Sequence, residues 1–297
     1  MIAVIDPSAI VGNIKVPASK SAMQRACALA LLNNGQTIIH NPGVSNDEIA
    51  AINIIKSLGA KVISRHETLT INSDGKLKPS ATIDCGESGL SLRMFAPIAA
   101  LSDSAVLLNG SGSLLKRQMH FIDEVFPKLK VKTVSNHGYL PIQITGPLQP
   151  GNISIDGSES SQYLTGLLFA FARQTKEQVC IHVTNLKSTP YIDLSLQMLD
   201  RFGYDVSHDG YQNFYVKPVY QKEKSVSYYT EADWSSASFL IVAGAIAGNI
   251  SLTGLDMHSV QADRAIIDVL HLCNASFKIV KDILSINTRN PLQAFEF

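Results

Sequence analysis

Polar and hydrophobic positions along this chain follow one order that recurs four times. Each segment opens with small polar residues, continues into a strongly apolar helix and a short apolar strand, and then passes through a loop to an amphipathic helix and strand-like residues. The openings lie at 19–21, 86–91, 157–162 and 231–236, the short strands at 37–40, 105–108, 179–183 and 250–252, and the amphipathic helices at 47–56, 117–127, 191–202 and 262–273.

The spacing of the segments predicts an internal repeat. Ser21, Ser88, Ser161 and Ser236 stand near the expected starts of the apolar helices, about 70 residues apart. A recurring period of this kind is typical of units that pack on one another. A unit of this length suits a compact fold that contains a βαβ element and buries its first helix. The predicted fold class is therefore mixed α/β (α+β).

Composition and charge narrow the class of protein. Charged residues make up 17% of the 297 residues, and 25 Lys and Arg balance 25 Asp and Glu. A balanced charge gives no support for nucleic acid or an anionic membrane as a partner. The N-terminal residues Met1–Asp6 lack the pattern of a signal peptide, and the four cysteines are scattered. We therefore expect a cytoplasmic protein with reduced thiols and no metal site.

The first apolar helix carries the clearest candidate for chemistry. Ser19-Lys20-Ser21 precedes it, and Arg25 follows within its first turns. A helix start presents unpaired backbone N–H groups and the positive end of the helix dipole, so it attracts anions. Lys20 and Arg25 add two cations that can converge on one small ligand. The structural alternative is a solvated basic patch beside a capped helix.

Several motifs, in this order along the whole chain, resemble the EPSP synthase (3-phosphoshikimate 1-carboxyvinyltransferase) family. Each motif is weak alone, and the ordered set is strong. The matching motifs are Ser19-Lys20-Ser21 with Arg25, Ser45-Asn46-Asp47, Gly86-Glu87-Ser88-Gly89-Leu90-Ser91-Leu92-Arg93, Ser160-Ser161-Gln162, Ser188-Thr189-Pro190-Tyr191-Ile192-Asp193, Asp233-Trp234-Ser235-Ser236-Ala237-Ser238 and Gln261-Ala262-Asp263.

The resemblance implies a particular division of the chain. The family fold has two lobes, each made of three βαβαββ units, and this chain matches four of the six units. Residues 15–229 would form one complete lobe, and 1–14 with 230–297 an incomplete second lobe. The family is monomeric, and an incomplete lobe would offer a surface for association.

The resemblance also implies an activity. The family transfers the enolpyruvyl group of phosphoenolpyruvate to the 5-hydroxyl of shikimate 3-phosphate, in the biosynthesis of aromatic amino acids, and needs no metal or organic cofactor. Both substrates are small and multiply anionic, so no nucleic acid or membrane partner is expected. Helix starts with Ser, Lys and Arg suit such ligands.

Site roles are carried over residue by residue. By resemblance, Lys20 lies between the two substrates, binds phosphoenolpyruvate and serves proton transfer, while Ser21 and Arg25 hold the shikimate carboxylate. Ser160, Ser161 and Ser188 are expected to hold the 3-phosphate. Gln162 and Tyr191 are expected to line the same pocket, and Gly89 to let the backbone approach phosphoenolpyruvate closely. Each has a structural alternative as a helix cap, a core ring or a turn.

The chain departs from the family pattern in four places. Glu87 stands where the family has Asn, Leu90 where it has Thr, and Ser113 where it has an arginine for phosphoenolpyruvate. Lys116 or Arg117 is a candidate substitute for that arginine. The sequence given also ends at Phe297, before the family segments that supply the catalytic Asp and further cations. We therefore expect a truncated form that is inactive or weakly active.

Three alternatives to this function stay open at this stage. A non-catalytic protein that binds an anionic ligand on the same fold would tolerate the loss of the family arginine. A UDP-N-acetylglucosamine enolpyruvyl transferase shares the fold, but it uses a reactive loop Cys and residues 110–118 contain none. A serine hydrolase is disfavoured because no Gly-x-Ser-x-Gly motif occurs.

Overall fold

The structure is a computed structural model that describes residues 6, 8–220 and 224–296. It divides into two compact units, a larger one of Lys20–Thr230 and a smaller one that joins 1–19 to 231–297. The predicted lobes, 15–229 and 1–14 with 230–297, stay predictions, because a division into compact units does not show which repeats complete a lobe. Residues 1–5, considered above for a signal peptide, lie outside the described residues.

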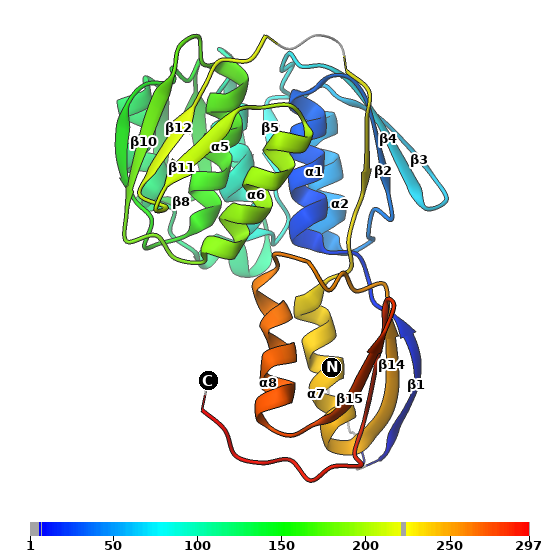
Figure 1. Cartoon of the computed structure of the whole chain (residues 1–297). Coiled ribbons are helices and arrows are strands. Elements are labelled where there is room, and N and C mark those ends of the chain that lie inside the picture. The colour runs from blue at the N-terminus through cyan, green and yellow to red at the C-terminus, as the bar shows by residue number, and fades with distance from the viewer. Residues whose placement is uncertain (1–5, 7, 221–223, 297) are drawn as a thin grey trace. The chain divides into compact units, whose positions relative to one another are not determined.

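Three four-stranded sheets of identical strand order build the larger unit (Figure 1). In each sheet a parallel pair at one edge continues into two antiparallel neighbours. In spatial order, the sheets are β13 (Val226–Tyr229), β2 (Asn34–His40), β4 (Thr68–Asp74) and β3 (Lys61–Arg65); β5 (Thr82–Asp84), β6 (Ala105–Asn109), β8 (Tyr139–Thr145) and β7 (Lys132–Asn136); and β9 (Ile153–Asp156), β10 (Val179–Thr184), β12 (Asn213–Val216) and β11 (Val206–Asp209).

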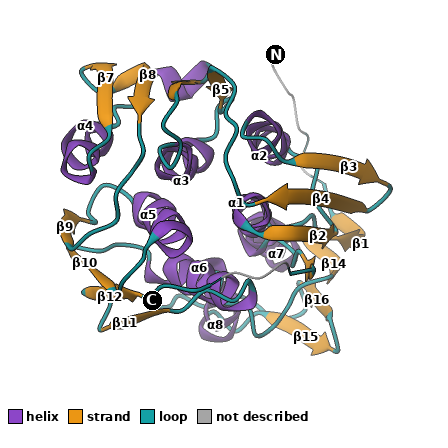
Figure 2. Cartoon of the chain, turned by 90° about the horizontal axis from the view of Figure 1, so that it is seen from above, coloured by secondary structure: helices purple, strands orange, loops and turns teal. Residues whose placement is uncertain are grey.

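The first helix of each repeat in the larger unit lies inside the ring of three sheets when the chain is seen from above (Figure 2). The first helix of each repeat is apolar on nearly every side and therefore fully packed, as expected for a helix with no solvent face. These helices are α1 (Lys20–Leu32), α3 (Gly89–Ala99) and α5 (Ser161–Gln174), and the second helices are α2 (Asn46–Ser57), α4 (His120–Val125) and α6 (Thr189–Arg201), with short 3-10 turns at η1 (Gly112–Lys116) and η2 (Phe126–Leu129). The predicted mixed α/β fold with repeated βαβαββ units is confirmed.

The first sheet is completed by the far end of the larger unit. Strand β13 pairs in parallel with β2, so that Val226 lies opposite Thr37 and Tyr229 opposite His40. Two hydrogen bonds extend the pairing, from Thr230 N to His40 O at 3.0 Å and from Lys224 N to Asn34 O at 2.7 Å. This return of the chain ties the last residues of the larger unit to its first repeat.

The starts of the first helices differ in detail from the predicted ones. Ser88 caps α3 and Ser160 caps α5, whereas Asp233, not a serine, caps the fourth helix by accepting a hydrogen bond from Ser236 N at 2.7 Å. Ser161 is the first helical residue of α5 and Ser21 lies in the first turn of α1. The four serines therefore lie at helix starts but not at equivalent positions: Ser88 is a cap, whereas Ser21, Ser161 and Ser236 lie in first turns.

The described residues of the smaller unit form one sheet and two α-helices. The sheet repeats the strand order of the larger unit, with a parallel edge pair followed by two antiparallel strands. Its strands are β1 (Ile10–Lys15), β14 (Gly248–Thr253), β16 (Ile283–Asn287) and β15 (Ser276–Val280), covered by α7 (Trp234–Ala247) and by η3 (Ala262–Ala265) with α8 (Ile266–Leu272). Trp234 and Ile241 anchor the core of this unit on the sheet.

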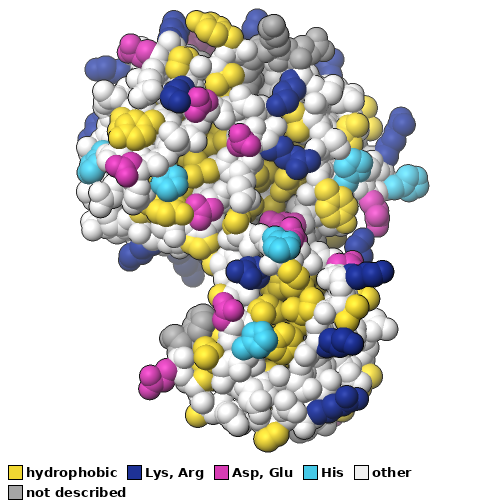
Figure 3. All heavy atoms as spheres, in the orientation of Figure 1, with side chains coloured by type: hydrophobic (Ala, Val, Ile, Leu, Met, Phe, Trp, Pro, Cys, Tyr) yellow, Lys and Arg dark blue, Asp and Glu magenta, His cyan; other side chains and the backbone are white. Residues whose placement is uncertain are grey.

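One face of α7 is apolar and exposed. Phe239 is 78% exposed, Val242 43% and Ile246 65%, and their spacing places them on one side of the helix. Hydrophobic side chains gather on the smaller unit where α7 runs (Figure 3). The corresponding helices α1, α3 and α5 expose no such face, so α7 is less completely packed than its counterparts.

We expect the backbone amides of α7 to exchange with deuterium at least about tenfold faster than those of α5, because fewer packed side chains oppose local opening. Hydrogen-exchange mass spectrometry on the monomeric chain measures this directly. Equal protection of α7 and α5 in a protein shown to be monomeric would contradict the expectation.

Candidate functional site

A pocket of about 310 Å³ in the larger unit brings together seven of the nine predicted site residues. They come from three distant parts of the chain, namely the start of α1, the start of α5 and the start of α6. The seven residues are Ser21, Arg25, Ser160, Ser161, Gln162, Ser188 and Tyr191. Leu90, Glu159 and Lys187 complete the lining, and Lys20 and Gly89 are not part of it.

Two larger hollows of the same unit lie elsewhere. One of about 500 Å³ runs between His182 and Gln212, and one of about 670 Å³ lies beside Gln36 and Lys61. Neither is lined by a predicted site residue. Size alone therefore does not select the site, and the convergence of cations, hydroxyls and a helix start favours the smaller pocket.

Arg25 is held in place at the inner wall of the pocket and is only 1% exposed. Its Nε donates to Ser195 Oγ at 2.9 Å, and its two terminal nitrogens donate to the backbone oxygens of Ser21 at 2.8 Å and Tyr191 at 3.3 Å. Burial lowers the pKa of Arg25 to about 10, partly offset by the nearby Tyr191 and Tyr228. The guanidinium therefore stays charged at neutral pH and is pre-oriented for an anionic group.

The start of α5 supplies donors to the same pocket. Ser160 caps this 14-residue helix, and its hydroxyl oxygen accepts a hydrogen bond from Gln162 N at 3.2 Å. A hydroxyl that accepts can also donate, so the cap does not consume its proton. The first N–H groups of the helix and its dipole favour an anion at this end. Ser160, Ser161 and Gln162 can thus surround one negatively charged oxygen group.

Ser188 stands at the start of α6 in a left-handed backbone conformation, with φ 59° and ψ 50°. Its side chain makes no capping hydrogen bond to that helix. Asn185, three residues earlier, also has a positive φ of 54°. Such conformations are uncommon for residues other than glycine and occur preferentially at functional sites. The bent loop turns Ser188 and the preceding Lys187 to the pocket.

Two arginines meet at the start of α3, beside Gly89. A Cβ placed on Gly89 would lie 2.9 Å from a terminal nitrogen of Arg93 and 2.9 Å from one of Arg117, so only a glycine leaves both guanidinium groups in place. Arg93 also donates to Gln162 Oε1 at 3.1 Å, which links this cluster to the pocket. The Nε atom of Arg93 is buried and has no hydrogen-bond partner among the described residues.

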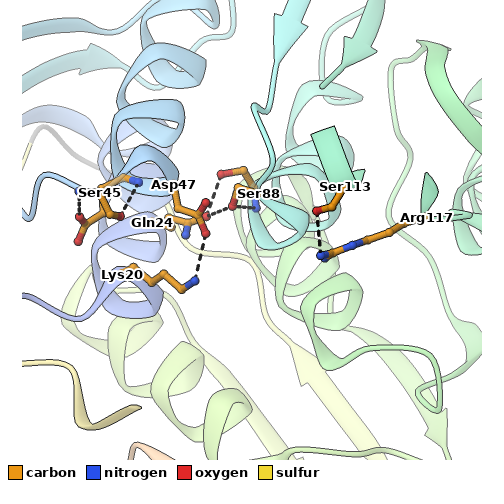
Figure 4. A network of polar contacts seen from close by, with 9 residues as sticks. Lys20, Gln24, Ser45, Asp47, Ser88, Ser113 and Arg117 are labelled. Carbon is orange, nitrogen blue, oxygen red and sulfur yellow. Dashed lines mark hydrogen bonds and ion pairs between the residues drawn. The ribbon is translucent and has the colours of Figure 1, made fainter. Parts of the chain in front are cut away.

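The loop that lacks the family arginine folds back onto this cluster. Arg117 donates to Ser113 Oγ at 3.4 Å (Figure 4). Ser113 N donates to Glu87 Oε2 at 2.9 Å. Of the two candidate substitutes for the family arginine, Arg117 is therefore the one whose side chain contacts Ser113 and lies beside Gly89. Glu87, the residue that replaces the family Asn, fixes this loop to the start of α3.

Lys20 lies outside the pocket and pairs with Asp47. Its Nζ is 3.2 Å from Asp47 Oδ2, at the start of α2, and the two side chains are 56% and 25% exposed. One turn further along α1, the Oε1 of fully buried Gln24 accepts hydrogen bonds from Ser88 Oγ at 3.2 Å and Ser91 Oγ at 2.8 Å (Figure 4). This link holds the helix that carries Lys20 against the start of α3.

The sequence gives little indication that the charged residues Lys187, Glu159 and Asp47 lie at or near the site. Lys187 and Glu159 directly precede the motif residues Ser188 and Ser160, and only this adjacency could have pointed to them. Asp47 was part of a matched motif without a role.

In the described part of the chain, no three His, Cys, Asp or Glu side chains gather as metal ligands. No helix among the described residues is long and apolar enough to cross a membrane.

Comparisons with known proteins show the family of the chain. A family model for EPSP synthase (3-phosphoshikimate 1-carboxyvinyltransferase) matches residues 4–295. A 3-phosphoshikimate 1-carboxyvinyltransferase from Clostridium perfringens (strain ATCC 13124) is 37% identical over 269 residues, which are 90% of this chain and 63% of the relative. One from Aeropyrum pernix is 31% identical over 290 residues, 98% of this chain and 66% of the relative.

Solved structures agree in fold. EPSP synthase from Acinetobacter baumannii superposes with a TM-score of 0.76 at 21% identity, over 95% of this chain and 65% of that one. The enolpyruvyl transferase NikO from Streptomyces tendae gives 0.75 at 16% identity, over 96% and 68%. The chain spans about 63% of the length of the first curated relatives. By its match over nearly all residues, the chain belongs to the EPSP synthase family.

Proposed function

We propose that the chain binds shikimate 3-phosphate in the pocket of the larger unit and thereby takes part in the transfer of an enolpyruvyl group from phosphoenolpyruvate to its 5-hydroxyl. The observation that carries this proposal is the convergence of Arg25, Ser161 and Ser188, from the starts of three different helices, on one pocket of about 310 Å³. That volume suits a small ring with two anionic substituents.

Two regions of the pocket suit two different anionic groups, a carboxylate and a phosphate. Arg25 is rigid and planar, and with the Ser21 hydroxyl it suits a carboxylate, which a guanidinium can hold through two parallel hydrogen bonds. The start of α5 and Ser188 offer hydroxyl and backbone donors that suit a phosphate. A substrate with a carboxylate and a phosphate on one ring would bridge these two regions.

The cluster at the start of α3 is proposed to bind phosphoenolpyruvate. Because Gly89 has no side chain, the guanidinium groups of Arg93 and Arg117 can lie close to it and provide two cations there. Lys20 is the proposed catalytic residue between the substrates, where it would bind phosphoenolpyruvate and exchange a proton with it. Its exposed pair with Asp47 is weak enough to rearrange when an anion arrives.

Replacing Arg117 by methionine tests which cation stands in for the family arginine. With shikimate 3-phosphate present, we expect the Kd for phosphoenolpyruvate to rise at least about tenfold, because a charged hydrogen-bond donor is lost. Binding of shikimate 3-phosphate alone should be unchanged. Calorimetry on Arg117→Met and on Lys116→Met measures both. A loss confined to Lys116→Met would contradict the assignment.

Transfer by this chain alone is proposed to be slow or absent, because a third of the length of the relatives lies outside the match. Phosphate release with both substrates measures it, beside calorimetry with shikimate 3-phosphate. Binding without turnover is the expected pair of results. Turnover at the rate of a full-length relative would contradict this part of the proposal. A monomeric state and a cytoplasmic location stay predictions.

A further inference from the structure

Lys187 lines the pocket, although no motif assigns it a role. We propose that Lys187 is a specificity-determining residue, which makes the pocket prefer a dianionic phosphate ester over the same ring with a hydroxyl group. This inference rests on the proposed function of the pocket and adds the residue by which one substrate is distinguished from its unphosphorylated form. It concerns a lysine that immediately precedes Ser188 in the bent loop before α6.

The charge balance of the pocket calls for such a cation. Its charged lining residues are Arg25, Glu159 and Lys187. Arg25 is committed to the inner wall by three hydrogen bonds, next to Ser21. The donors at the start of α5 are uncharged hydroxyl and amide groups, whereas a phosphate monoester carries a charge of about −1.5 to −2 at pH 7. Lys187 is the cation that the loop adds to these neutral donors.

Glu159 makes the need for that cation greater. This carboxylate directly precedes the cap of α5, where a phosphate would lie, and it also lines the pocket. Its charge reaches the neighbouring Tyr163, whose pKa is raised first by burial and further by Glu159. A carboxylate beside a phosphate repels it. Lys187 therefore offsets an acid of the protein as well as the charge of the ligand.

The loop that carries Lys187 is fixed to the loop that enters α5. Asp156 accepts hydrogen bonds from Ser158 N at 3.0 Å, from Ser158 Oγ at 2.8 Å and from Asn185 Nδ2 at 3.3 Å. Hydrogen bonds from Ser158 lower the pKa of Asp156, and the charge of Lys187 adds to the effect. The two phosphate-side loops thus share one anchor, and Lys187 stands close to it.

Lys187 is not committed to a fixed ion pair. The ion pairs among the described residues join Lys20 to Asp47, Lys78 to Asp74 and Lys217 to Asp205. Its exposed side chain can therefore turn to an incoming phosphate without breaking a salt bridge of the fold. A lysine suits this role, because a compact charge on a flexible stem follows the ligand into the pocket.

The test compares shikimate 3-phosphate with shikimate by calorimetry on the whole chain. In Lys187→Met we expect the Kd for shikimate 3-phosphate to rise about tenfold, the Kd for shikimate to stay unchanged, and the salt dependence of phosphate-ester binding to weaken. Lys187→Arg should retain the preference. Glu159→Gln should tighten binding of shikimate 3-phosphate only. Lys128→Met, an exposed lysine on η2, is the matched control.

Equal losses for both ligands, or no loss for either, would overturn the role of Lys187 and leave the pocket assignment standing. A wild-type chain that binds neither ligand would overturn the proposed function itself, and with it this inference. A Lys128→Met variant that loses the preference to the same extent would show a general effect of net charge and would also overturn it.

Discussion

Replacing Arg25 by methionine is expected to weaken the binding of shikimate 3-phosphate at least about 100-fold, because the loss of two charged hydrogen bonds to a carboxylate costs about 3 kcal/mol or more. Arg25 is the strongest candidate for so large an effect. It is 1% exposed, it lines the pocket, and three hydrogen bonds fix its guanidinium. Such a group binds its ligand without losing much conformational freedom on binding.

The same substitution also affects stability, and the two effects have to be separated. Methionine would leave the backbone oxygens of Ser21 and Tyr191 and the Ser195 hydroxyl without this donor, which lowers the free energy of unfolding by about 2 kcal/mol or more. Urea unfolding measures that change, and calorimetry well below the unfolding transition measures binding. Arg173→Met, which removes a hydrogen bond to Gly75 O, is the control.

Arg173 lies in the last turn of α5, outside the residues that line the pocket, so its loss should leave binding unchanged. A folded Arg25→Met protein that binds shikimate 3-phosphate as tightly as the wild type would contradict the role of Arg25. An Arg173→Met protein with the same loss of affinity would show that stability, and not the site, governs the result.

Gly166→Ala is expected to lower the free energy of unfolding by about 2 kcal/mol through overpacking. A Cβ at Gly166 would lie 2.6 Å from the backbone oxygen of Met94 and 3.0 Å from that of Arg93. Those atoms belong to α3 and not to flexible side-chain ends, so relief requires α3 and α5 to move apart. Both helices begin at the proposed substrate sites, so binding should weaken as well.

The sign of this effect is the decisive point. Within a helix, alanine is ordinarily more favourable than glycine by about 0.5–1 kcal/mol, so a stabilised Gly166→Ala protein would contradict the close contact of α3 and α5. Urea unfolding followed by circular dichroism measures the change. Gly151→Ala provides the control, because its added Cβ would meet nothing within 4 Å.

The recurring pattern of apolar and polar segments was sufficient to predict the repeated unit. Helices α1, α3 and α5 are apolar along nearly their whole length, and each is preceded by small polar residues, so both their type and their starts could be read locally. The strand that pairs with β2 at the edge of its sheet could not be predicted in this way. Strand β13 lies at the other end of the larger unit, and no local signal links Val226 to Thr37.

The candidate site residues that belong to sequence motifs could be predicted, whereas those brought together only by the fold could not. Arg25, Ser161 and Ser188 were expected together, and they do line one pocket. The sequence left Lys116 and Arg117 as equal candidates, and only the fold of η1 brings Arg117 beside Gly89. Likewise, nothing local indicates that Ser188 takes a positive φ, which turns Lys187 and its loop to the pocket.

The central claim is that the pocket at the starts of α1, α5 and α6 binds shikimate 3-phosphate. Hydrogen-exchange mass spectrometry on the whole chain, with and without this ligand, tests it most directly. The account predicts slower exchange in peptides that cover 20–26, 158–166 and 186–193, and unchanged exchange around His182–Val183 and Gly210–Gln212, which line the larger hollow. Protection confined to that hollow, or no protection at saturating ligand, would contradict it.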